Sequence, residues 1–202
     1  MSKSIRGKGM NVVDFNVDGE KHFSDGENEL PFQLKDFWSW YASNLLNAPL
    51  RGAVAEYIVA KALGDNEPYR NVWASYDLLY NGCPIEVKSS AYLQSHESEL
   101  LSRVSFSIDK HNHYEPLDSA METKRHSSLY VFCLYVCKDR AEANPMRMEQ
   151  WLFYIVPTSV IEERLGDQRS LSFRSLLKLQ PVIASYGTLK SEIDKLCQTQ
   201  KQ

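Results

Sequence analysis

The residues best suited to chemistry lie in one short stretch, SYDLLYNGCPIEVKSS at positions 75–90. It places two carboxylates, Asp77 and Glu86, and the ammonium group of Lys88 on either side of an Asn-Gly pair. Neighbouring carboxylates can bind a divalent cation through oxygen ligands, or share a proton and act as an acid–base pair. Either chemistry depends on how the chain brings these three groups together.

Asn81 and Gly82 predict a two-residue hairpin turn of type I′, which requires positive φ at both positions. Counting outward from this turn, Asp77 lies directly opposite Glu86. Because side chains alternate along a strand, Lys88 shares the face of Glu86, while apolar residues occupy the other face. The pattern therefore predicts a hairpin with its charges gathered on one side.

Two opposed carboxylates are costly unless something offsets their charge. At a separation of about 5 Å and an effective dielectric constant near 20, they repel by roughly 3 kcal/mol. Lys88, a divalent cation or a shared proton could each offset this repulsion. Glu56 adds a third acid, because it is the only charged residue between Arg51 and Lys61 of an apolar segment. A buried carboxylate needs either a basic partner or a metal ion, and both remain open for Glu56.

An acid on a helix, an acid on a strand and Glu-x-Lys on the partner strand resemble the PD-(D/E)XK nuclease superfamily. The matching residues are Glu56, Asp77, Glu86 and Lys88, and the resemblance covers residues 50–94. Tyr76 stands where the motif name expects proline. A Glu-x-Lys pair alone has little weight, since the chain contains a second one at residues 122–124. The conjunction with the hairpin and the helix acid carries the resemblance.

The resemblance implies Mg²⁺-dependent hydrolysis of a phosphodiester, with Mn²⁺ as a substitute. It implies four metal ligands: Asp77, Glu86, the backbone carbonyl of Val87, and Glu56 either directly or through water. Lys88 would orient the attacking water or stabilise developing negative charge. Ser90 and Gln94 are candidates for contact with the nucleic acid.

The function expected from the resemblance is a DNA endonuclease of restriction or repair type, acting as a monomer or a homodimer. The alternative is a noncatalytic nucleic-acid-binding or protein-interaction domain that retains the nuclease fold. The sequence contains no nucleophile elbow and no P-loop, which argues against a metal-independent hydrolase.

The remaining pattern predicts an α/β fold, a restriction-endonuclease-like mixed β-sheet flanked by helices. Residues 1–30 are expected to form a polar arm and residues 31–202 a single domain. The aromatic stripe of the first expected helix is interpreted as core. Helices are expected at residues 34–46, 47–64, 158–165 and 172–179, and strands at 72–80, 84–89, 104–108, 129–137 and 150–156.

Composition excludes several classes of protein. The 202 residues include 43% hydrophobic side chains, with a net charge of −3, so disorder and nonspecific coating of nucleic acid are not indicated. The longest apolar run is too short to span a bilayer, and no apolar leader is present, so no membrane partner and a cytoplasmic location are expected. Residues 124–126, with Arg103 and Lys110, are a candidate cationic patch, and an ordinary charged surface is the favoured interpretation. His111 and His113 are interpreted as part of a solvated loop rather than a metal site.

Overall fold

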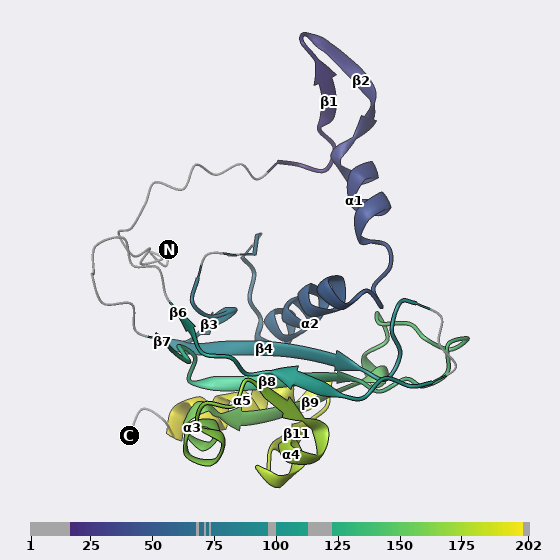
Figure 1. Ribbon diagram of the computed structural model, residues 1–202. Helices are drawn as coiled ribbons and strands as arrows, with labels where there is room; N and C mark the ends of the chain where they lie inside the picture. The colour runs from purple at the N-terminus through teal and green to yellow at the C-terminus, as the bar shows by residue number, and fades with distance from the viewer. Residues whose placement is uncertain are drawn as a thin grey trace. The chain divides into compact units, whose positions relative to one another are not determined.

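The computed structural model describes residues 17–67, 69–70, 72, 74–96, 100–112 and 123–199 (Figure 1). It divides the chain into two compact units, one containing residues 17–43 and the other beginning at residue 44. The elements are β1 (His22–Asp25), β2 (Asn28–Gln33), α1 (Leu34–Ala42), α2 (Ala48–Leu63), β3 (Leu78–Tyr80), β4 (Cys83–Ala91), β5 (Ser105–Ser107), β6 (His111–Asn112), β7 (Thr123–Lys124), β8 (Leu129–Tyr135), the 3₁₀ helix η1 (Met148–Gln150), β9 (Trp151–Pro157), α3 (Thr158–Leu165), β10 (Ser170–Ser172), α4 (Phe173–Lys178), β11 (Val182–Ala184) and α5 (Tyr186–Thr199).

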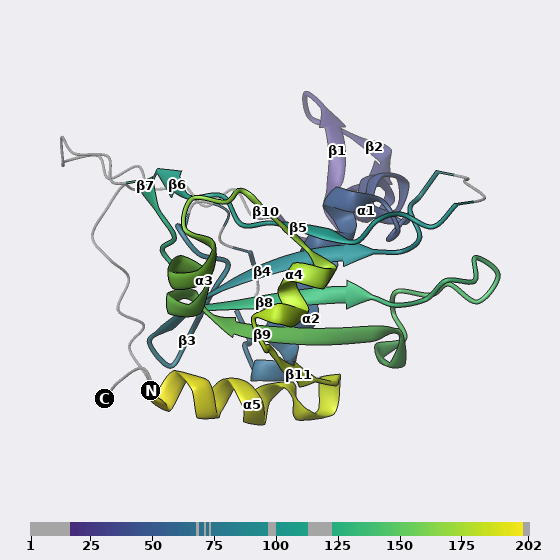
Figure 2. The ribbon, with the colours of Figure 1, turned by 60° about the horizontal axis from the view of Figure 1, so that its bottom comes forward.

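The second unit is organised around a five-stranded sheet in the order β11-β9-β8-β4-β3. The neighbours β4 and β8 run parallel, and the other pairs in this sheet are antiparallel. Figure 2 shows β4 and β8 pointing the same way, with helices packed around the sheet. The predicted α/β class, a mixed sheet flanked by helices, is confirmed.

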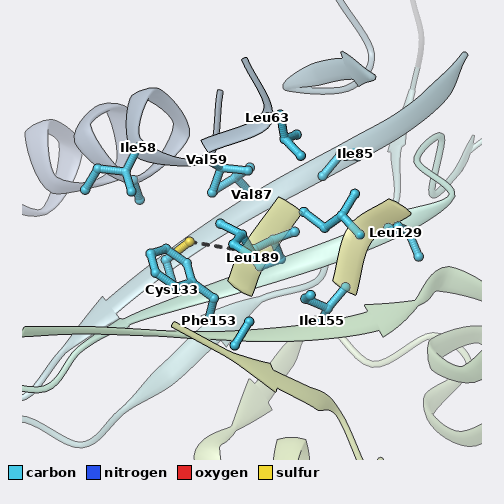
Figure 3. Packing of buried hydrophobic residues seen from close by; sticks show 14 of the residues in the cluster. Ile58, Val59, Leu63, Ile85, Val87, Leu129, Cys133, Phe153, Ile155 and Leu189 are labelled. Carbon is cyan, nitrogen blue, oxygen red and sulfur yellow. Dashed lines mark hydrogen bonds between the residues drawn. The ribbon is translucent and has the colours of Figure 1, made fainter. Parts of the chain in front are cut away.

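Each face of the sheet has its own hydrophobic core. On one face, α2 and α5 cover side chains of β4, β8 and β9, including Val87, Cys133 and Phe153 (Figure 3). On the other face, β5, β10, α3 and α4 cover the alternate side chains of β8 and β9, including Phe132 and Tyr154. Burial on both faces explains why β8 is apolar along its whole length.

Local signals fix the ends of α2. Asn47 is the N-cap, a proline follows at the first turn, and Gly64 ends the helix in the left-handed conformation with φ of 80°. The helix buries one side against the sheet, while Tyr57 and Lys61 remain exposed. Because α2 is fixed in this way, it holds Glu56 over the hairpin side of the sheet.

The first unit is a β1–β2 hairpin followed by α1, so the expected arm boundary at residue 30 falls inside β2. The interpretation of the α1 aromatic stripe as core is wrong, because no residue of α1 is buried. Phe37 and Tyr41 stack on each other with ring centroids 5.7 Å apart, and Trp40 is 80% exposed. The aromatic side chains of α1 are therefore exposed and do not form a core in this unit.

Two cations of the candidate patch, Arg125 and Lys110, are paired within the protein. Arg125 is buried and donates hydrogen bonds to Glu162 and to the carbonyls of Ile108, Gly166 and Gln168. Lys110 forms an ion pair with Asp167 at 2.8 Å. Arg125 therefore links α3 and the residues after it to Ile108, whereas the Lys110 pair lies at the surface. His113 lies outside the described residues. Among the helices of the described residues, none is long and apolar enough to cross a membrane.

Candidate functional site

The hairpin turn has the predicted geometry. Asn81 and Gly82 both have positive φ, 50° and 81°, and Leu78 pairs with Ile85 in the predicted register. The expected strand at residues 72–80 is shorter than predicted, however, since β3 begins at Leu78. Asp77 therefore lies just before the ladder rather than within it.

Asp77 is anchored to β4 through both its backbone and its side chain. Its N–H donates to the carbonyl of Ile85 at 3.1 Å. Ile85 already pairs with Leu78, so this hydrogen bond does not extend the ladder to Glu86. Its Oδ2 accepts a 2.7 Å hydrogen bond from the backbone N–H of Val87. The predicted cross-strand pair of Asp77 and Glu86 is therefore not part of the β3–β4 ladder, which ends at Leu78 and Ile85. The Asp77 carboxylate is fixed instead beside Val87, the residue between Glu86 and Lys88.

Glu86 and Lys88 form an ion pair on one face of β4. Lys88 Nζ lies 2.5 Å from Glu86 Oε1, and the side chains of Lys88 and Glu86 are 23% and 12% exposed, respectively. Glu86 lies beside Tyr130 of β8 in the parallel ladder. Burial raises the pKa of Tyr130, and the nearby charge of Glu86 raises it further. This face is therefore not the solvated surface on which an ion pair contributes little.

Glu56 extends from α2, on the face of the sheet that Val87 occupies, and is paired with Arg70. Arg70 Nη2 donates to Glu56 Oε1 at 2.6 Å, and Arg70 Nε donates to Glu56 Oε2. The Glu56 side chain is 13% exposed and that of Arg70 is 52% exposed. The ionic partner that the sequence left open for Glu56 is therefore present.

The pKa values of Glu56 and Arg70 have different dominant causes. Burial raises the pKa of Glu56 despite the hydrogen bond from Arg70. The hydrogen bond to Glu56 raises the pKa of Arg70, and partial burial lowers it to a smaller extent. Desolvation is thus the dominant effect at Glu56, while at Arg70 it is outweighed by the hydrogen bond.

Electrostatics connects the helix acid to the hairpin. The charge of Asp77 raises the pKa of Glu56, and that of Lys88 lowers it, after the larger effects of burial and Arg70. Glu56, Asp77 and Lys88 thus lie within electrostatic range although 32 positions separate the first from the last. Glu86 is not among the charges that affect Glu56. It lies beside Tyr130, which belongs to the core on the sheet face opposite the one that α2 covers.

Carboxylate and carbonyl oxygens are the donors that Mg²⁺ prefers, so the chemistry of this set fits the ion. The described side chains nevertheless form no group of three acidic, histidine or cysteine residues placed to hold a metal. In the structure, Glu56 faces Arg70, Glu86 faces Lys88, and Asp77 accepts from Val87. Binding a cation would require these internal partners to be exchanged for it.

Ser90 and Gln94 are both engaged within the protein. Ser90 is buried, and its Oγ accepts a hydrogen bond from the N–H of Ser105 at 3.3 Å. The Gln94 side chain accepts from Arg51 Nη1 at 3.1 Å. Their expected contact with nucleic acid remains a prediction, and the burial of Ser90 gives it no support.

Arg70 was not identified from the sequence as part of the site. The signal that could have indicated it is the unpaired acid itself, because a buried carboxylate needs a cation. Arg70 is the first basic residue after α2. Its position in a segment without regular secondary structure gave no spacing rule from which to predict the contact.

No family model matches this chain, and neither the curated proteins nor the solved structures contain a significant match. The interpretation of the site therefore depends on its own geometry.

Proposed function

We propose that this protein is a metal-dependent nuclease that hydrolyses phosphodiester bonds of nucleic acid, with DNA as the substrate. One observation carries the proposal: the Val87 N–H holds the Asp77 carboxylate at the residue between Glu86 and Lys88, whose side chains form a largely buried ion pair. A fold needs no such concentration of acids for its stability, because each must be neutralised by a partner. Perturbed carboxylates that cluster with a lysine are typical of functional sites.

In this proposal, Asp77, Glu86 and the Val87 carbonyl hold Mg²⁺ or Mn²⁺, with Glu56 completing the ligand set directly or through water. The bound cation would polarise the phosphate and acidify a water molecule. The Lys88 ammonium group would break its ion pair with Glu86 and donate a hydrogen bond to the attacking water or to a phosphate oxygen. In the hydrolysis, the water loses a proton as its oxygen bonds to phosphorus, the bond from phosphorus to the leaving oxygen breaks, and that oxygen gains a proton.

A second candidate is a noncatalytic domain that binds nucleic acid or protein. The internal neutralisation of the acids favours it, because Arg70 and Lys88 already occupy positions where a cation would act. The two candidates differ in one measurable property, since only the nuclease must exchange these contacts for a metal ion.

The test is calorimetric titration of Mg²⁺ and Mn²⁺ into the wild type and Asp77→Asn, with nicking assays on supercoiled plasmid and single-stranded DNA. Asparagine can still accept the Val87 N–H, so the substitution removes charge while retaining the anchor. We expect metal affinity to fall at least about tenfold and nicking at least about 100-fold. Glu163→Gln, an exposed acid on α3, is the control and should change neither. A folded wild type that neither binds metal nor cleaves would support the noncatalytic domain.

We further propose a cytoplasmic location. No disulfide joins any of the four cysteines, all of which lie in the described part of the chain, as expected for a reducing compartment. A homodimer is the form in which such a nuclease could cut both strands. Sedimentation of the active protein with and without DNA distinguishes it from a monomer.

A further inference from the structure

The carboxyl ends of the neighbouring parallel strands β4 and β8 lie side by side at Ala91 and Tyr135 (Figure 2). We call this end of the two strands the edge, although both strands are in the interior of the sheet. The segments that follow these two strands lie together, because Arg140 after β8 hydrogen-bonds the backbone of residues after β4. The first turns of α2 reach the same edge through the contact of Arg51 with Gln94. In open α/β sheets, ligands bind outside the carboxyl ends of the strands.

Arg51 is a buried cation at this edge, and none of its partners among the described residues is an anion. The residue is 4% exposed, and its guanidinium donates to neutral acceptors, the Leu46 carbonyl at 3.0 Å and the Gln94 side chain at 3.1 Å. Its Nε has no hydrogen-bond partner within the described part of the chain. Burial lowers the pKa of Arg51, and desolvation is the cause. A buried charge in this condition needs an anion.

Two further cations at the same edge have neutral partners among the residues that the structure describes. Arg140 Nη2 donates to the carbonyls of Gln94 at 3.0 Å and His96 at 2.9 Å. Lys138 Nζ lies 4.6 Å from the centroid of the Tyr92 ring. The acid between them, Asp139, accepts from the backbone N–H of Ala141 at 2.9 Å. The edge thus carries three cations bound to neutral groups.

We propose that this edge binds phosphate groups of a nucleic-acid strand beyond the scissile one, with the exposed Lys138 and Arg140 in contact with the phosphates and the buried Arg51 contributing its charge. The proposal rests on the proposed function and adds a subsite to it. Guanidinium groups match the geometry of phosphate oxygens and can bind them with two hydrogen bonds. Arg51 precedes Glu56 by five residues on α2, which is about 7.5 Å along the helix axis. The phosphate held here is therefore not the reacting one, and the edge positions the strand.

The experiment measures fluorescence anisotropy of a labelled oligothymidine strand in EDTA, where no cleavage can occur. Arg140→Gln and Lys138→Gln each remove an exposed cation of the edge. Arg164→Gln is the matched control, because Arg164 is an exposed arginine on α3 that donates to the Lys178 carbonyl at 3.2 Å. Arg51→Gln and Arg51→Lys test the buried cation, with urea unfolding to verify that each variant is folded.

We expect Arg140→Gln to weaken binding roughly tenfold, as for the removal of a charge-assisted hydrogen bond. The slope of log K against log salt should become shallower by about 0.7 for each phosphate group that the variant no longer neutralises. Arg51→Lys should retain more affinity than Arg51→Gln. The control should stay within about twofold of the wild type, since it lies away from the edge.

Three outcomes would overturn the inference: no binding of the strand by the wild type, equal weakening in Arg140→Gln and Arg164→Gln, or full affinity in folded Arg51→Gln and Arg140→Gln. Failure here is distinguishable from failure of the proposed function. A wild type that binds metal and nicks plasmid, with unchanged strand affinity in the edge variants, overturns only this subsite. Selective weakening of strand binding in a protein that never binds metal overturns only the nuclease.

Discussion

At the residue scale, Glu56 is the acid with the clearest conflict between burial and charge. Its pKa is raised, so the native state binds its proton more tightly than the unfolded chain does. Stability contributed by protonated Glu56 is therefore complete below the unfolded value of 4.5 and is lost as pH rises through the native value. The ionised form that a metal ion would need is the less stable one in the metal-free protein.

Glu56→Gln replaces this acid by a neutral isostere and should remove this pH dependence. We expect the free energy of unfolding of Glu56→Gln, relative to the wild type, to increase as the pH rises from 4.5 through the native pKa of Glu56. Urea unfolding of both proteins over this range measures the difference. A difference that is independent of pH would contradict the burial of a titrating Glu56.

Arg70→Met removes the cation that lowers the pKa of Glu56, so that pKa should rise further. We expect a destabilisation of about 1–2 kcal/mol at neutral pH, because a buried carboxylate loses a charged partner that is itself half exposed. The pH range over which stability is lost should extend to higher pH than in the wild type. Adding Glu56→Gln should restore most of the stability, and urea unfolding of the double variant measures this coupling.

Lys88→Met separates metal binding from catalysis. Glu86 no longer has to leave its ammonium partner, so we expect the affinity for Mg²⁺ to be unchanged or higher. Nicking should fall by at least about 100-fold, because Lys88 is no longer there to orient the water or stabilise developing charge. Calorimetry and plasmid nicking on the same sample measure the two quantities. A parallel decrease of both would instead indicate that Lys88 has only a structural role.

At the element scale, the hairpin was predictable because its turn chemistry is local. Asn81 and Gly82 determined the turn type and the β3–β4 register. The residue at which β3 begins depended instead on the contacts of Asp77 with β4. The Glu56–Arg70 pair joins α2 to a segment without regular structure, so no periodicity indicates it. The expected set of helices also omitted α5, whose apolar residues Leu189 and Ile193 complete the core over α2 and β9.

Gly82→Ala tests how strongly the turn supports the site. Gly82 has φ of 81°, and a Cβ there would meet no atom within 4 Å, so the cost is conformational alone. We expect a decrease of about 1 kcal/mol in the free energy of unfolding. Gly187→Ala in α5 is the control, since that position also has open space but no positive φ, and alanine should be neutral or stabilising there. Equal effects at both positions would contradict a role for backbone strain.

At the scale of the whole molecule, charge and hydrophobic packing are divided between the two units. Residues 17–43 carry six acidic and two basic side chains, and all six of their aromatic rings are exposed. Both hydrophobic cores are built from residues beginning at Leu46. The first unit thus adds acidity and aromatic surface, while the second contains the cores, the hairpin site and the cationic edge.

Deletion of residues 1–43 should therefore leave a folded protein. We expect its free energy of unfolding to remain within about 0.5 kcal/mol of the full chain, because no residue of either described core is removed. Affinity for the oligothymidine strand should be unchanged or higher, since acidic side chains repel phosphate and the cations of the edge remain. Urea unfolding and anisotropy measure the two quantities. A truncated protein that folds normally but no longer binds the strand would assign strand binding to the aromatic first unit, because base stacking on exposed rings could then outweigh its negative charge.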